Sequence, residues 1–119
     1  MKVLLVDDEH ELVTTLVERL EYRDIEADCA FSGLEALEKM LNAAYSVIVV
    51  DLKMPGMSGS DLIREIQKRH PEIPVLLMTG HGIRIEEEDI PEGIADFLPK
   101  PVSLTELISK MYEVTGKNE

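Results

Sequence analysis

Five polar side chains with complementary chemistry each follow an apolar run of the 119-residue chain. Asp7 and Asp8 follow VLLV, Asp51 follows VIVV, Thr79 follows VLLM, and Lys100 comes soon after IADFL. Neighbouring carboxylates repel one another and need a cation, and an all-oxygen ligand set with room for water suits Mg²⁺ better than zinc or copper. A lysine and a hydroxyl can then hold phosphoryl oxygens while a carboxylate attacks phosphorus. These residue types indicate a site that forms an aspartyl phosphate.

Each of these residues also has an ordinary structural interpretation. Asp7 or Asp8 can cap a helix, and Asp51 can open a turn. Thr79 fits turn chemistry beside a glycine, and a lysine before a proline is usually solvated. Independent turn residues, however, have no reason to bring three carboxylates, a hydroxyl and a cation to one edge of a sheet. We therefore favour the functional interpretation.

The apolar runs predict the strands that must position these side chains. Three runs are continuous, as in parallel strands that are buried on both faces: residues 3–6, 47–50 and 75–78. The run at 25–31 alternates instead and suits an edge strand, with one face formed by Ile25, Ala27, Cys29 and Phe31. A shorter run at 94–98 predicts a fifth strand.

Apolar residues at helical spacing predict helices between the strands, each with one apolar stripe. The stripes are Leu12, Val13, Leu16, Val17 and Leu20; Leu34, Leu37, Met40 and Leu41; Leu62, Ile63 and Ile66; and Leu104, Leu107, Ile108 and Met111. A serine with an acidic residue three positions later predicts a capped helix start at Ser32, Ser58 and Ser103. Between Thr79 and Phe97 we expect a short or irregular helix, because a proline and a glycine interrupt it.

This strand–helix alternation predicts a single α/β domain over residues 1–119, in which a doubly wound parallel sheet has helices on both faces. In such sheets, sites form beyond the carboxyl ends of the strands. All five polar residues are expected at that edge.

Composition restricts the class of partner and the compartment. The chain has 24 acidic and 12 basic residues and a formal charge of -12, which disfavours direct binding to nucleic acid and to anionic lipid. Its apolar runs are too short to span a membrane, and its one cysteine, Cys29, excludes an internal disulfide. We therefore expect a cytoplasmic domain without membrane insertion.

Four motifs in this order resemble the receiver domain of two-component response regulators over essentially the whole chain: LLVDDE at 4–9, VVDLKMPGMSG at 49–59, LLMTGHG at 76–82 and DFLPKP at 96–101. The resemblance implies a flavodoxin-like sheet of strand order 2-1-3-4-5. It also implies that Asp51 is the phosphoacceptor. Asp7, Asp8, Asp51 and the backbone carbonyl of Lys53 would then bind Mg²⁺, for which Mn²⁺ could substitute.

The same resemblance implies roles for residues after the fourth and fifth strands. Thr79 would be the switch hydroxyl, Phe97 the aromatic residue that turns inward with it, and Lys100 the phosphate-binding lysine, followed by a cis peptide bond to Pro101. His81 lies two residues past Thr79, as Lys53 does past Asp51. Both positions vary in the family, and we expect their side chains to tune the lifetime of the aspartyl phosphate.

The resemblance implies partners as well. A sensor histidine kinase or a histidine phosphotransfer protein would supply the phosphoryl group, and the domain would catalyse only its own phosphorylation and dephosphorylation. An output domain, a downstream protein or a phosphorylation-dependent dimer would use the surface formed by segment 83–93, the fifth strand and the last helix. The sequence leaves open whether the chain is a stand-alone regulator, part of a longer regulator or part of a hybrid kinase.

Two other functions share some of these features. An aspartate-nucleophile phosphohydrolase also uses Mg²⁺ and a covalent aspartyl phosphate, but it usually has a second acid where this chain has Lys53. A phosphorylation-independent interaction module would need a broken site, and this one is intact. The receiver interpretation remains the leading one.

Overall fold

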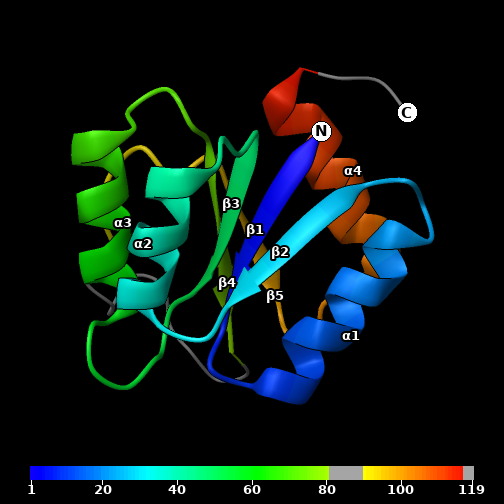
Figure 1. Ribbon diagram of the computed structural model, residues 1–119, viewed down its shortest axis with the longest axis horizontal. Helices are drawn as coiled ribbons and strands as arrows, with labels where there is room; N and C mark the ends of the chain where they lie inside the picture. Colours follow the sequence, from blue (N-terminus) through cyan, green and yellow to red (C-terminus); the bar gives the residue numbers. More distant parts are fainter. Residues whose placement is uncertain (81–89, 117–119) are drawn as a thin grey trace.

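Strands and helices alternate from β1 to β4 in the computed structural model, which describes residues 1–80 and 90–116 (Figure 1). The strands are β1 (Lys2–Val6), β2 (Glu26–Ala30), β3 (Val47–Asp51), β4 (Val75–Thr79) and β5 (Asp96–Pro99). The helices are α1 (His10–Glu21), α2 (Gly33–Asn42), α3 (Gly59–Arg69) and α4 (Leu104–Thr115). All neighbouring strands pair in parallel, in the order β2-β1-β3-β4-β5. The predicted fold class and strand order are confirmed.

The sheet lies between two helical layers, with α1 and α4 on one face and α2 and α3 on the other (Figure 1). Successive strand residues therefore enter different cores. Val47 and Val49 belong to the core under α1 and α4, whereas Ile48 and Val50 belong to the core under α2 and α3. Because both faces are covered, the central strands are continuously apolar.

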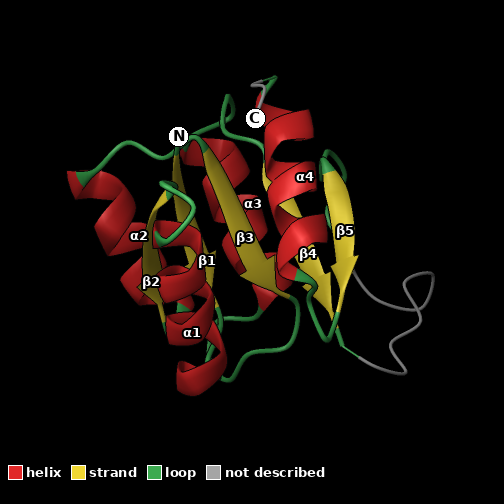
Figure 2. Ribbon diagram, turned by 90° about the vertical axis from the view of Figure 1, so that its right-hand side faces the viewer, coloured by secondary structure: helices red, strands yellow, loops and turns green. Residues whose placement is uncertain are grey.

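The edge strands differ from the central ones. β2 lies at one edge and β5 at the other (Figure 2). The predicted inner face of β2 is confirmed, because Ile25, Ala27, Cys29 and Phe31 all pack with the α1/α4 core. β5 begins two residues later than its predicted range of 94–98 and ends one residue later. The helix expected between Thr79 and Phe97 falls largely outside the described residues.

Three of the four helices begin with the predicted serine caps. The side-chain oxygen accepts a hydrogen bond from the backbone N–H three residues later, at 3.2 Å for Ser32, 3.1 Å for Ser58 and 3.3 Å for Ser103. These bonds satisfy donors that the helix itself leaves unpaired. None of the helices in the described part of the chain is long and apolar enough to cross a membrane.

Two leucines of the predicted apolar stripe of α2 lie away from its buried face. Leu34 and Leu41 are 70% and 74% exposed. Successive helical residues are rotated by about 100°, so these two lie roughly 90° around the helix from the buried face formed by Ala36, Leu37 and Met40. Ala36, which was not part of the predicted stripe, is fully buried in the α2/α3 core.

Candidate functional site

The carboxyl ends of β1 and β3 bring two aspartates together. Val6 of β1 pairs with Val50 of β3, so the next residue in each chain segment, Asp7 and Asp51, lies at the same edge of the sheet. Asp7 is fully buried and Asp51 is 4% exposed. Both carboxylates are fixed by strands that are packed on both faces.

Asp8 completes a cluster of three carboxylates that could hold a metal ion. One ligand oxygen from each of Asp7, Asp8 and Asp51 lies within 4.8 Å of the others. Oδ2 of Asp7 is buried without a well-aligned hydrogen bond. Since neighbouring carboxylates repel one another, and oxygen ligands suit a hard divalent cation, this arrangement fits such an ion.

Lys100 reaches the cluster from the carboxyl end of β5. Its backbone N–H donates to the carbonyl oxygen of Thr79 at 2.8 Å, which fixes the segment after β5 beside the end of β4. Its Nζ lies 3.0 Å from Oδ2 of Asp7 and 3.3 Å from Oδ2 of Asp51. The peptide bond between Lys100 and Pro101 is cis.

The pKa values of Asp51 and Lys100 are both raised. Burial raises the pKa of Asp51 to about 6, and repulsion from Asp7 adds to this, while Lys100 and the backbone N–H of Lys53 oppose it. Burial disfavours the charged form of Lys100, but contacts with Asp7 and Glu9 prevail and raise its pKa above that of an ordinary lysine. The site therefore favours the charged form of Lys100 and disfavours the charged form of Asp51.

The turn after β3 is held tightly against the strand. The backbone N–H of Leu52 donates to the carbonyl of Met78 at 3.2 Å, and that of Gly59 donates back to Leu52 at 3.1 Å. A Cβ on Gly59 would lie 2.3 Å from the carbonyl oxygen of Asp51, so only glycine fits at the start of α3. This contact fixes the backbone beneath the Asp51 carboxylate.

Three further predicted residues, Thr79, Phe97 and Lys53, belong to the described part of the chain. Thr79 is buried at the end of β4, and Phe97 of β5 packs partly buried against the α2/α3 core. Lys53 is exposed in the turn after β3. His81 lies outside the described residues. The structure thus brings together Asp7, Asp8, Asp51 and Lys100, with Thr79 joined to Lys100 through the backbone.

Two neighbours of the site had no functional role in the sequence analysis. Glu9 appeared only as the last residue of the motif LLVDDE, but its Oε1 lies 3.0 Å from Nζ of Lys100. His10 begins α1, and its ring stacks on Phe31 with a centroid distance of 3.8 Å. No spacing rule pointed to either contact, because each joins segments that are far apart in the sequence.

Comparisons with known proteins agree with this geometry. The family model described as "Response regulator receiver domain" matches residues 3–112. A CpxR homolog from Haemophilus influenzae, a transcriptional regulatory protein, is 38% identical over 98% of this chain and 51% of its own length. The sensor kinase CckA of Brucella abortus is 36% identical over 98% of this chain and 13% of its own length.

A solved structure agrees as well. The response regulator protein TrrA of Thermotoga maritima, in complex with Mg²⁺ and BeF, has a TM-score of 0.82. It is 29% identical, and the match covers 95% of this chain and 97% of that one. The first curated relatives are longer, and this chain spans about half of their length.

Proposed function

Since this chain belongs to the response regulator receiver domain family, we propose that Asp51 accepts a phosphoryl group and that the resulting change signals to a partner. Receiver domains are signalling modules of two-component systems. The observation that carries the proposal is the contact of buried Asp51 with Lys100 inside a cluster of three carboxylates. A histidine kinase or a phosphotransfer protein would be the donor.

The chain's own residues have distinct tasks in this reaction. A carboxylate oxygen of Asp51 bonds to phosphorus while the bond from phosphorus to the donor nitrogen breaks, and the donor imidazole leaves with that electron pair. Lys100 is placed to hold a phosphoryl oxygen as a point charge, and the Thr79 hydroxyl donates to another. The raised pKa of Asp51 supports this assignment, because perturbed groups cluster at functional sites.

A divalent cation is part of the proposal. Asp7, Asp8, Asp51 and the backbone carbonyl of Lys53 would hold Mg²⁺, or Mn²⁺ in its place. When bound, the ion neutralises charge that would repel a phosphate donor and stabilises the transferring phosphoryl oxygens. The oxygen-only cluster and the burial of Asp7 and Asp51 support it, as does the Mg²⁺ complex of the similar TrrA.

Signalling would follow as a shift between two arrangements of Thr79 and Phe97. The output surface would be formed by segment 83–93, β5 and α4, and it would contact an output domain, a downstream protein or a second copy; much of that segment lies outside the described residues. Lys53 and His81 would set the lifetime of the phosphorylated state. The rate of label loss from Lys53→Ala and His81→Ala variants measures that contribution.

The direct test is phosphorylation by a small donor. We expect wild type, incubated with Mg²⁺ and labelled acetyl phosphate, to acquire acid-stable, base-labile label, and Asp51→Asn to acquire none. Asp61→Asn, which removes an exposed acid in the first turn of α3, is the matched control and should label like wild type. Equal labelling of Asp51→Asn and wild type would contradict the proposal.

A further inference from the structure

Lys100 has three carboxylate partners, and one of them does not belong to the metal cluster. Its Nζ lies 3.0 Å from Asp7, 3.3 Å from Asp51 and 3.0 Å from Glu9. Asp7 and Asp51 are buried, whereas the side chain of Glu9 is 61% exposed. Glu9 is therefore the partner that can move with the lysine.

Glu9 also departs from the pattern at the other helix starts. It is the N-cap residue of α1, but its side chain makes no capping hydrogen bond. The N-cap residues of the other three helices are serines, and each accepts a hydrogen bond from the first turn. At α1 the side chain contacts Lys100 instead. Local rules are most often broken at functional sites, where another interaction takes precedence.

The contact matters because Lys100 and a divalent cation would compete for the same oxygens. Asp7 and Asp51 face Lys100 and also supply two of the three carboxylates of the cluster. A cation in the cluster would repel the ammonium group, and Lys100 would lose its two buried partners together. A third carboxylate outside the cluster lowers the cost of that rearrangement.

We infer that Glu9 is a positioning residue that retains Lys100 at the rim of the site when a divalent cation takes up Asp7 and Asp51. This inference rests on the proposed function, because it assumes that the cluster binds such a cation. It adds a residue whose role is to make metal binding compatible with a nearby lysine. Without the Glu9 charge, Lys100 would depend more on Asp7 and Asp51 and would compete more strongly with the cation. Removing that charge should therefore weaken metal binding.

A double-mutant cycle separates this role from a simple charge effect. Mg²⁺ affinity would be measured by titration calorimetry for wild type, Glu9→Gln, Lys100→Met and the double variant. In the wild-type background we expect Glu9→Gln to weaken Mg²⁺ binding about fivefold, the scale of an exposed ion pair. In the Lys100→Met background the same change should have less than about twofold effect, because the competing ammonium is gone.

Two further variants distinguish positioning from a role in stability. Glu11→Gln removes another acid in the first turn of α1 and should leave Mg²⁺ affinity within about twofold of wild type. Glu9→Ser introduces the cap residue that the other helices use. It should weaken Mg²⁺ binding as Glu9→Gln does, yet leave the melting temperature equal to or above that of wild type.

The outcomes separate this inference from the proposed function. If wild type bound no Mg²⁺ at millimolar concentration, the proposed metal site itself would fail. If wild type bound Mg²⁺ and Glu9→Gln matched Glu11→Gln, the role of Glu9 would be overturned. A fivefold effect of Glu9→Gln that persisted without Lys100 would also overturn it, because the glutamate would then act on the metal directly.

Discussion

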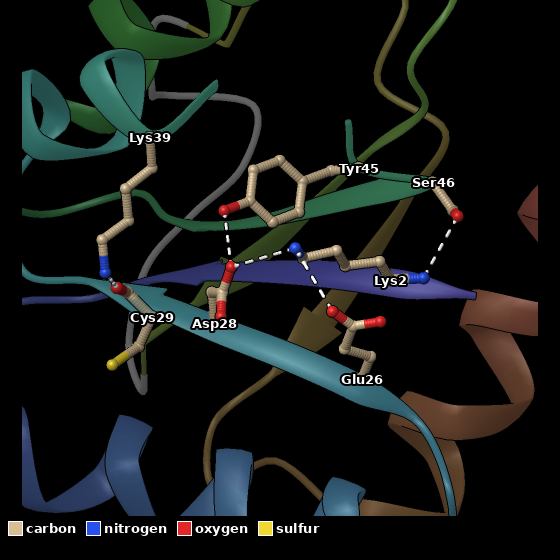
Figure 3. A network of polar contacts seen from close by, with 7 residues as sticks. All are labelled: Lys2, Glu26, Asp28, Cys29, Lys39, Tyr45 and Ser46. Atoms are coloured by element: carbon tan, nitrogen blue, oxygen red, sulfur yellow. Dashed lines mark hydrogen bonds and ion pairs between the residues drawn. The ribbon is translucent and has the colours of Figure 1, made fainter. Parts of the chain in front are cut away.

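Two clusters of charged residues on the same sheet differ in burial and in the balance between acidic and basic groups. The rim cluster consists of Asp7, Asp8, Glu9, Asp51 and Lys100. The edge network consists of Lys2, Glu26, Asp28, Tyr45 and Ser46 (Figure 3). The rim cluster contains four carboxylates and one ammonium group, and two of the carboxylates, those of Asp7 and Asp51, are buried. The edge network leaves its acids partly exposed to water.

The edge network is satisfied by its own partners. Nζ of Lys2 lies 3.3 Å from Glu26 and 3.7 Å from Asp28, and the hydroxyl of Tyr45 donates to Asp28 at 2.7 Å. The backbone N–H of Lys2 donates to Ser46 at 3.2 Å. This network ties the edge strand β2 to β1 and to the start of β3. In the edge network the acids are balanced by a lysine and a hydroxyl, whereas the rim cluster has four carboxylates beside one lysine.

The largest effect should come from the backbone that supports the rim. Gly59→Ala would place a methyl group against the backbone of Asp51 and Leu52, which cannot move aside as a side chain can. We expect a loss of about 3 kcal/mol in the free energy of unfolding, measured by urea denaturation.

Gly33→Ala is the matched control for this change. Gly33 also begins a helix, α2, but an added Cβ there meets the flexible side chain of Met57. We expect a change below about 1 kcal/mol. Equal losses of unfolding free energy in the two variants would mean that the contact of Gly59 with the backbone of Asp51 and Leu52 does not stabilise this part of the fold.

The next effect should have the opposite sign. Because the pKa of Asp51 is raised to about 6 in the fold, its stabilising contribution is complete below the unfolded pKa of about 4 and is lost as pH rises through about 6. Asp51→Asn cannot ionise, so in metal-free buffer at pH 7 it should be more stable than wild type by about 2 kcal/mol.

The pH profile is the check on this prediction. The difference between Asp51→Asn and wild type should shrink toward zero as pH falls below about 4, where both side chains are neutral. Asp24→Asn, which changes an exposed acid, should show no such profile. If metal-free Asp51→Asn were less stable than wild type at pH 7, ionised Asp51 would not destabilise the fold, and this prediction would be wrong.

The smallest effect should come from the edge network. Tyr45 is 6% exposed, and burial, together with its hydrogen bond to Asp28, raises its pKa. Tyr45→Phe removes that bond and should cost about 1 kcal/mol in the free energy of unfolding, without changing Mg²⁺ affinity. Tyr22→Phe, at a residue that is 89% exposed, should change neither quantity. An altered Mg²⁺ affinity in Tyr45→Phe would show that the two clusters are coupled.

Most of the fold could be predicted from local patterns. Buried strands and capped helix starts follow from rules about neighbouring residues, so the strand predicted at 47–50 and the helix start at Ser32 were identified correctly. Leu34 and Leu41 show the limit of these rules. A leucine at the border of a helical stripe is buried or exposed according to how closely the helix approaches the sheet, and that distance depends on residues elsewhere.

Some features of the candidate site could likewise be predicted from the sequence, and others could not. The positions of Asp7, Asp51 and Lys100 could be predicted from the sequence, because each follows an apolar run and the ends of parallel strands meet at one edge of a sheet. The contact of Glu9 with Lys100 and the support of the Asp51 backbone by Gly59 became visible only in the folded domain. These are contacts between segments far apart in the chain. Their distances are set by packing of the whole domain, which no local pattern encodes.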